Sequence, residues 1–237
     1  MLTAEQMESE GHPRQRRIAV LISGRGSNCM AIAHSIREGR LNGCEIGVVV
    51  SNIPGALGIE TAKSLGIPVI TLEGRGREQS DHEEAITALL RKFRIDLICL
   101  AGYRRVLSVA FVRQWKGCIL TIQPSLLPSF SGRGAAQQAL DSGAQFTGCT
   151  VSLVDEAIDG GVIVLQRIVE IQEDDSVSSL LERLVVEEHI AYTEAIRRVI
   201  GGEYEARGRR YVSIDLPREE LEWESPEVGD ERTVEAG

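Results

Sequence analysis

Short apolar runs alternate with helical patterns along most of this chain, and this alternation limits the possible folds more than any other feature. The runs are rich in β-branched residues and have the length of strands; they lie at residues 18–22, 45–50, 69–71, 96–100 and 118–123. Between them, apolar residues recur at helical spacing. Strands that are apolar throughout and separated by helices predict a parallel sheet covered by helices on both faces. We therefore expect an α/β fold.

The pattern changes in the C-terminal part of the chain. Two apolar runs, at residues 148–154 and 162–169, are joined by residues 155–161. This connection is too short for a crossover helix, so the two strands are expected to form an antiparallel pair. A long helix over about residues 176–200 follows. The predicted architecture is thus a mostly parallel central sheet with a C-terminal antiparallel pair.

The length of 237 residues, of which 43% are hydrophobic and 26% charged, suits one large domain and is too short for two. We expect this domain to cover residues 17–213. Residues 1–16 are polar and lack a period, which predicts a mobile N-terminal extension. Residues 214–237 are strongly acidic and contain proline, which predicts a solvated C-terminal tail.

Charge and cysteine content exclude several classes of protein. A net charge of −9 argues against a nucleic-acid partner, because phosphate backbones are bound by neutralising them with Lys and Arg. The five cysteines show no metal-ligand spacing, so we expect reduced core residues and no metal. Since no run has the length of a membrane span and residues 1–16 do not form a signal peptide, we expect a cytoplasmic protein without a membrane partner.

The first candidate site follows the first strand directly. Residues 23–28 have the sequence SGRGSN and lead into a helical pattern through Cys29, Ile32 and Ile36. A glycine loop between a strand and a helix brings backbone N–H groups and the positive end of a helix dipole together, which suits phosphate. The alternative is a tight turn in which Ser27 or Asn28 caps the helix.

The second candidate site is the end of the strand at residues 118–123. Thr121 and Gln123 lie two residues apart, on one face of the strand, just before Pro124 ends it. Ligands of open α/β sheets bind in the crevice beyond the carboxyl ends of the strands, so these side chains are candidates for a functional role. The alternative is that they satisfy local backbone groups before the turn.

Five motifs in one order resemble the phosphoribosylglycinamide formyltransferase family of purine biosynthesis. They are SGRGSN at 23–28, AGYRR at 101–105, the PSLLP segment at 124–128, IDGG at 158–161 and EEH at 187–189. The resemblance covers roughly residues 17–213. It implies a Rossmann-like formyltransferase fold, with helices on both faces, and transfer of a formyl group from 10-formyltetrahydrofolate to the amine of glycinamide ribonucleotide. The implied partners are these small molecules, and a monomer or a homodimer is expected.

The resemblance also implies roles for individual residues. Gly26, Ser27 and Asn28 would hold the substrate phosphate, Glu188 would contact the ribose or glycinamide, and Asp159 would match the catalytic aspartate. Arg77 would lie near the folate tail. The pterin pocket would be lined, largely through backbone groups, by Arg105, Val106, Leu107, Val154, Asp155, Glu156, Ala157, Ile158 and Asp159.

The departures from the family pattern concern the chemistry. Where the family has Asn and His as partners of the aspartate, this chain has Thr121 and Gln123. The turn at residues 131–136 lacks the usual proline, Val185 replaces what is often a substrate-binding glutamine, and Arg104 replaces what is often methionine beside the folate site.

Thr121 and Gln123 can still donate hydrogen bonds to an oxyanion, but neither titrates near pH 7. We therefore expect Thr121, Gln123 and Asp159 to support a slow formyltransferase. The alternatives are an inactive member of the family that binds a phosphorylated or folate ligand, and a formyltransferase acting on a different amine. No histidine offers an obvious replacement, since His12 is in the extension, His34 and His82 are expected within helices away from strand ends, and His189 is expected to bond a neighbouring carboxylate or backbone group.

Overall fold

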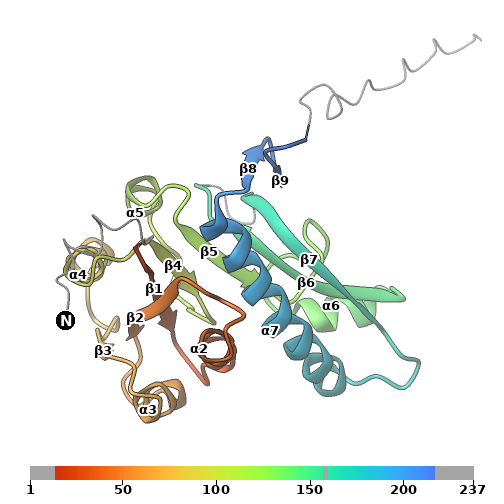
Figure 1. Ribbon diagram of the computed structural model, residues 1–237. Coiled ribbons are helices and arrows are strands. Elements are labelled where there is room, and N and C mark those ends of the chain that lie inside the picture. The colour runs from red at the N-terminus through yellow and green to blue at the C-terminus, as the bar shows by residue number, and fades with distance from the viewer. Residues whose placement is uncertain (1–13, 157–159, 217–237) are drawn as a thin grey trace, which may run out of the picture.

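The computed structural model describes residues 14–156 and 160–216 (Figure 1). Within them, strand β1 (Arg16–Ile22) begins one residue before the predicted start of the domain. Gln15 Nε2 donates to the carbonyl of Cys44, and Arg14 forms an ion pair with Asp96. Most of the predicted N-terminal extension and of the acidic tail lies outside the described residues, so the domain boundaries stay predictions.

The first half of the chain alternates strands and helices as predicted. The strands after β1 are β2 (Cys44–Ser51), β3 (Val69–Thr71), β4 (Leu97–Leu100) and β5 (Ile119–Gln123). The helices between them are α2 (Ser27–Arg37), α3 (Leu57–Ser64), α4 (Gln79–Lys92) and α5 (Val109–Gln114).

The second half adds strands β6 (Phe146–Leu153) and β7 (Val162–Glu170) and the long helix α7 (Val177–Gly201). All strands form one sheet in the order β3-β2-β1-β4-β5-β6-β7-β9-β8. Strands β1 to β5 are parallel, whereas β6 pairs antiparallel with both β5 and β7. The predicted fold class is confirmed, including the C-terminal antiparallel pair.

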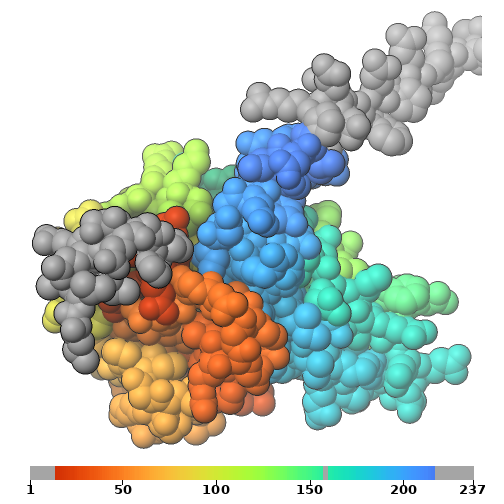
Figure 2. Space-filling view, in the orientation of Figure 1, coloured from red at the N-terminus to blue at the C-terminus, as the bar shows by residue number. Residues whose placement is uncertain are grey.

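The two faces of the sheet are covered by different helices. In β1, Ile18, Val20 and Ile22 pack in one cluster with side chains of α2, α3 and α7. The alternate residues Ala19 and Leu21 pack in a second cluster with side chains of α4 and α5. Strand β1 is therefore apolar on both faces, as a covered parallel strand must be. Figure 2 shows α2 in orange beside α7 in blue.

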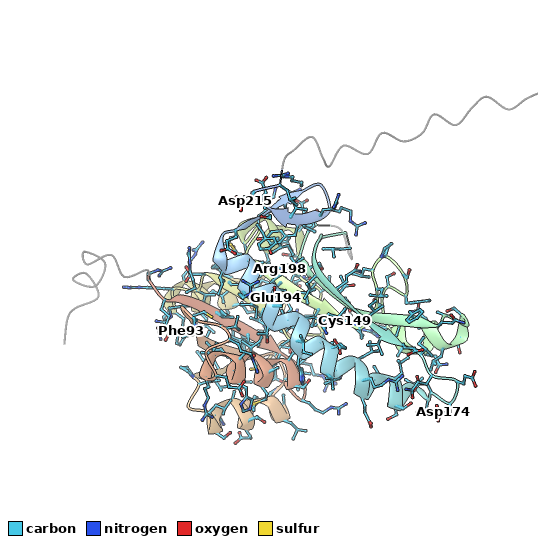
Figure 3. The ribbon with its side chains drawn as sticks, turned by 45° about the vertical axis from the view of Figure 1, so that its right-hand side comes forward. Phe93, Cys149, Asp174, Glu194, Arg198 and Asp215 are labelled. Atoms are coloured by element: carbon cyan, nitrogen blue, oxygen red, sulfur yellow. The ribbon has the colours of Figure 1, made fainter. Side chains whose placement is uncertain are left out.

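Three short elements were not predicted. Helix α6 (Ala135–Asp141) buries only three alanines and follows a glycine-containing turn, so it has no recognisable apolar stripe. Strands β8 (Tyr204–Arg207) and β9 (Arg210–Ser213) form a hairpin at the edge of the sheet. Side-chain stacking holds this hairpin to α7: the guanidinium of Arg198 lies 5.2 Å from the ring centroid of Tyr204, which stacks on Tyr211. Figure 3 shows Glu194 and Arg198 on the part of α7 below the hairpin.

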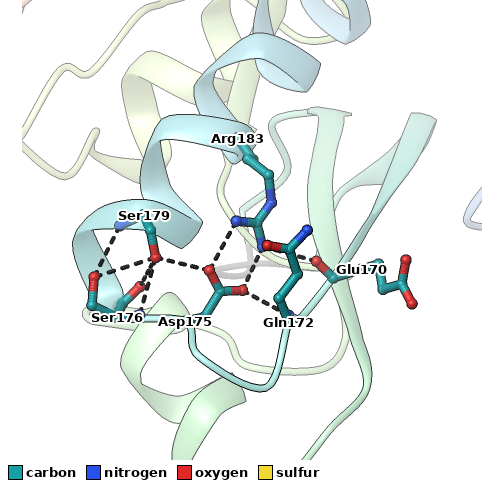
Figure 4. A network of polar contacts seen from close by, with 6 residues as sticks. All are labelled: Glu170, Gln172, Asp175, Ser176, Ser179 and Arg183. Atoms are coloured by element: carbon teal, nitrogen blue, oxygen red, sulfur yellow. Dashed lines mark hydrogen bonds and ion pairs between the residues drawn. The ribbon is translucent and has the colours of Figure 1, made fainter.

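A network of side chains fixes the start of α7 (Figure 4). Ser176 Oγ accepts from the backbone N–H of Ser179, and Ser179 Oγ accepts from the N–H of Ser176, which makes a capping box. Asp175 accepts hydrogen bonds from the guanidinium of Arg183 and from the N–H of Gln172. These hydrogen bonds, chiefly those from Arg183, lower the pKa of Asp175. The start of the helix that carries Glu188 is thereby fixed.

No helix among the described residues is both long and apolar enough to cross a membrane.

Candidate active site

The loop between β1 and α2 has a backbone that only glycine accommodates well. Gly26 is the N-cap of α2 and has a φ of 76°, in the left-handed region. A Cβ on Gly26 would lie 3.0 Å from the Cα of Gly58, in the first turn of α3. The N–H of Gly58 in turn donates to the carbonyl of Gly24 at 3.0 Å. The loop is thus pressed against α3, and the first N–H groups of α2 are available to a ligand because a helix start has no partners for them.

A buried hydrogen-bond chain joins this loop to the loop after β4. Ser23 Oγ donates to Asn52 Oδ1 at 2.5 Å and accepts from the backbone N–H of Arg104 at 2.9 Å. Ser23 is 4% exposed and Asn52 8%. Because β1 lies between β2 and β4, these three residues follow the carboxyl ends of three neighbouring strands. The chain fixes the two loops relative to each other.

The end of β5 presents Thr121 and Gln123 next to these loops. Thr121 pairs with Leu100, the last residue of β4, and on its other side with Ser152 of β6. Gln123 pairs with Thr150. Both side chains are half-buried, which leaves part of each accessible to a ligand.

One cavity of about 350 Å³ joins the two candidate sites that the sequence predicted. It lies where the strand order reverses between β1 and β4, the usual place for a ligand in such a sheet. Its described lining comes from the loop after β1, the loop after β4, the end of β5 and one residue of α7: residues 24–28, 100–104, 121–124 and Glu188. No histidine is among these lining residues.

Glu188 reaches the cavity from the opposite half of the chain. Asn28 Nδ2 donates to Glu188 Oε2 at 2.9 Å. Tyr192, one turn further along α7, lies with its hydroxyl 3.1 Å from the carbonyl oxygen of Leu100 and 3.0 Å from that of Leu120, so it can donate to either. These contacts hold α7 over the ends of β4 and β5.

The polar groups around Glu188 have unused hydrogen-bonding capacity. Burial raises the pKa of Glu188, and the hydrogen bond from Asn28 lowers it only in part. Asn28 is 7% exposed, and its Oδ1 has no hydrogen-bond partner among the described residues. A buried acceptor without a partner destabilises a protein by about 1–3 kcal/mol. A ligand that brings an N–H or O–H group to Asn28 Oδ1 would remove this cost.

The predicted folate-binding residues Arg77, Arg105, Val106 and Leu107 are not part of the lining of this cavity. Arg105 donates to the carbonyl of Gly74 and lines, with Arg75, a second cavity of about 450 Å³. The carbonyl of Val106 accepts from Gln79 Nε2 at 3.0 Å. Leu107 packs against the apolar cluster below α4 and α5. Arg77 is exposed, just before α4.

The loop after β6 is described up to Glu156. The N–H of Val154 donates to the carbonyl of Ile119 at 2.8 Å, and Val154 packs on the same cluster as Leu107. Asp155 Oδ1 accepts from the N–H of Glu156, and Glu156 forms an ion pair with Arg113 of α5. Ala157, Ile158 and Asp159 lie outside the described residues. The position of the predicted catalytic carboxylate therefore stays a prediction.

The sequence did not predict the role of His82. His82 lies within helix α4 as expected, and its Nε2 lies 3.0 Å from the hydroxyl of Tyr103, a residue of the cavity lining in the loop after β4. Burial, with smaller effects of Arg105 and Arg77, lowers the pKa of His82. His189 Nε2 has no hydrogen-bond partner within residues 14–156 and 160–216, contrary to expectation, and His189 lines a separate cavity between α2 and α7. The helical spacing gave no signal for the contact of His82 with Tyr103 or for the cavity beside His189.

Among the side chains that the structure describes, no group of three or more His, Cys, Asp or Glu residues is arranged to hold a metal ion.

The fold and the cavity define a class of α/β protein that holds a small ligand at the switch point of its sheet, with an anion-binding loop on one side and polar strand ends on the other. Comparison with known proteins narrows this class. Residues 16–196 match the family model described as formyl transferase. The chain belongs to the formyl transferase family.

Named relatives agree with this assignment. The chain is 41% identical over 190 residues to the trifunctional purine biosynthetic protein adenosine-3 of Homo sapiens; the match covers 80% of this chain but 19% of that protein. It is 35% identical over 202 residues to the chloroplastic phosphoribosylglycinamide formyltransferase of Arabidopsis thaliana, covering 82% of this chain and 69% of the relative. The chain thus spans less than a fifth of the trifunctional protein's length.

A solved structure shares both fold and sequence. The crystal structure of glycinamide ribonucleotide transformylase 1 from Symbiobacterium toebii superposes with a TM-score of 0.81 at 38% identity, covering 85% of this chain and 95% of that chain.

Proposed function

We propose that this chain transfers a formyl group from 10-formyltetrahydrofolate to the amine of glycinamide ribonucleotide, and that it does so slowly. Membership of the formyl transferase family supports the class of reaction. The observation that carries the proposal is the single cavity that joins Gly26, Thr121, Gln123 and Glu188. A phosphorylated amine bound there would have its phosphate at the start of α2 and its amine toward the end of β5.

The phosphate would be held by the N–H groups of Gly26, Ser27 and Asn28 together with the dipole of α2. Glu188 and the unpartnered Oδ1 of Asn28 accept hydrogen bonds, so they suit the ribose hydroxyls or the glycinamide N–H.

The folate co-substrate would occupy the neighbouring surface. Leu107 and Val154, which pack on the same apolar cluster, would contact the pterin, together with Arg105, Val106, Asp155 and Glu156. Ala157 and Ile158 complete this set by resemblance to the family. Arg77 and the second cavity beside Arg105 and Arg75 would meet the acidic tail of the folate.

The chemistry builds negative charge on the formyl oxygen and positive charge on the attacking nitrogen. The hydroxyl of Thr121 and the amide of Gln123 would donate to the oxygen. Asp159 would accept the amine's proton through water. Since neither Thr121 nor Gln123 can act as an acid near pH 7, a contribution of about 10²–10⁴ from a titrating group at these positions is absent.

The substituted pair supports a second candidate, an inactive family member that binds a phosphorylated or folate ligand. A steady-state assay with 10-formyltetrahydrofolate and glycinamide ribonucleotide separates the two. The proposed enzyme turns over measurably, and Asp159→Asn abolishes this turnover. Background rates in the parent, together with binding of glycinamide ribonucleotide, would establish the second candidate instead.

A further inference from the structure

The described lining of the cavity has more positively than negatively charged residues. The charged residues of the described lining are two arginines, Arg25 and Arg104, and one glutamate, Glu188. Glu188 is bonded to Asn28 rather than to either arginine. Neither Arg25 nor Arg104 forms an ion pair with any residue that the structure describes. Two arginines therefore border the cavity without an ion-pair partner in the part of the chain that the structure describes.

The two arginines stand in different places relative to the reacting atoms. Arg25 belongs to the loop after β1, which is the predicted phosphate side. Arg104 belongs to the loop after β4, and β4 is the direct neighbour of β5, with Leu100 level with Thr121. Of the two arginines, Arg104 thus belongs to the loop next to the end of β5, where Thr121 and Gln123 lie.

The backbone of Arg104 is fixed while its side chain is exposed. Its N–H is held by the buried Ser23, whose hydroxyl is itself bonded to Asn52. A long, flexible side chain on an anchored backbone can reach over the cavity mouth at little cost in backbone entropy. A guanidinium keeps its charge at all relevant pH values, unlike an imidazole.

We infer that Arg104 is a catalytic residue of the proposed reaction, placing its guanidinium on the formyl oxygen and supplying the positive charge that Thr121 and Gln123 cannot. This inference rests on the proposed function. The amine lone pair forms a bond to the formyl carbon, and the C=O π electrons move to the oxygen, where Arg104 stabilises the negative charge. The C=O bond then re-forms as the bond from carbon to N10 of tetrahydrofolate breaks. The amine nitrogen loses one proton, N10 gains one, and the products are the formamide and tetrahydrofolate.

In the inferred mechanism, Arg104 supplies the positive charge that a His would supply in the Asn and His pair of the family. The neutral donors Thr121 and Gln123 fix the direction of the oxygen, and the guanidinium adds the charge. Removal of one donor to a developing oxyanion typically lowers kcat by about 10²–10³. The loss should fall on kcat, because the charge exists only after the amine has attacked.

The test compares the parent with Arg104→Met, Arg104→Lys and Arg104→Ala in the formyl transfer assay. Calorimetry with glycinamide ribonucleotide gives the Kd of each variant.

We expect Arg104→Met to lower kcat about 10²–10³-fold while its Kd changes less than about threefold. The kcat of Arg104→Lys should lie between that of Arg104→Met and that of the parent. Free guanidinium at millimolar concentration should restore part of the activity of Arg104→Ala, which a purely structural loss would not allow. Arg91→Met, an exposed arginine of α4, serves as the matched control.

Three results would overturn the inference. A kcat within about threefold of the parent in Arg104→Met means that the cation has no catalytic role, while the proposed function stands. A weaker Kd with unchanged kcat makes Arg104 a phosphate contact. A parent without turnover removes the proposed function and this inference together. Thermal unfolding of each variant identifies misfolding, and the Arg104→Lys variant and the guanidinium rescue keep the test decisive if Arg104→Met does not fold.

Discussion

The two sides of the cavity differ in how well they match the family pattern. On the loop side, Gly26, Ser27 and Asn28 stand in the expected order, and the loop is packed closely on α3. On the strand side, the predicted positions of the family's Asn and His pair are held by Thr121 and Gln123, which have different chemistry. Both sides line one cavity. In the proposed function, ligand binding and group transfer are therefore carried by separate parts of the fold, so the residues of one can change while those of the other persist.

The largest effect is expected from restoring the strand side. The double change Thr121→Asn with Gln123→His should raise kcat about 10²–10⁴-fold, because it adds a titratable group and an amide donor where charge develops. Steady-state kinetics measure it, with the Kd for glycinamide ribonucleotide expected to stay within about threefold.

The matched control removes both donors instead. Thr121→Val with Gln123→Met should lower any parental rate further, by about 10²–10³ for a lost donor. Equal rates in the parent and both double variants would mean that the end of β5 takes no part in the reaction.

A change on the loop side should instead weaken binding. Gly26→Ala places a Cβ 3.0 Å from the Cα of Gly58 at a φ of 76°, a conformation that disfavours L-residues by about 1–2 kcal/mol. We expect a Kd for glycinamide ribonucleotide about tenfold weaker, measured by calorimetry. Gly24→Ala is the control for stability, since a Cβ there meets no atom within 4 Å. An unchanged Kd in Gly26→Ala would separate the loop from phosphate binding.

Replacement of Glu188 should change the stability of the chain in a way that depends on pH. Burial raises its pKa above the ordinary 4.5, so its ionised form destabilises the folded chain at neutral pH. Glu188→Gln should therefore raise the free energy of unfolding at pH 7.5. This gain should shrink as the pH falls through the raised pKa of Glu188, and it should be gone below the ordinary Glu pKa. Urea unfolding at several pH values measures it. If the extra free energy of unfolding in Glu188→Gln grew toward acid pH, burial would not be what raises the pKa of Glu188.

Asp175 should show the opposite dependence, with a smaller effect. Hydrogen bonds from Arg183 lower its pKa, so its stabilising contribution is present above the ordinary pKa of 3.8 and is lost as the pH falls through the lowered value. Asp175→Asn should lower the Tm at pH 7, and the difference should vanish in strong acid. Asp174→Asn, at the exposed neighbouring position, is the control and should leave the Tm nearly unchanged (Figure 3). Equal shifts in both variants would mean that the network in Figure 4 does not stabilise α7.

The sequence predicted the parts of the fold that depend on local patterns. The strands β1 to β5 and the helix starts follow from apolar runs, glycines and β-branched residues, which act over a few positions. Both candidate sites were predicted at the carboxyl ends of strands, whereas the cavity that joins them is a finding of the structure. Helix α6 and the hairpin β8–β9 were not, since their short segments gain order from packing on distant elements.

The finer geometry of the site could not be predicted for the same reason. The hydrogen bond between Asn28 and Glu188 joins residues 160 positions apart, and that between His82 and Tyr103 joins two different elements. Arg104 appeared in the sequence as a departure from the family, but only the cavity showed that it borders the same space as Thr121 and Gln123.

Calorimetric titration of glycinamide ribonucleotide into the parent chain, without folate, tests the central claim most directly. The account predicts one binding site per chain, with a Kd about tenfold weaker in Gly26→Ala and unchanged within about threefold in the Thr121→Asn, Gln123→His double variant. No binding by the parent, or equal binding by parent and Gly26→Ala, would contradict the claim that the loop side of the cavity holds the phosphate.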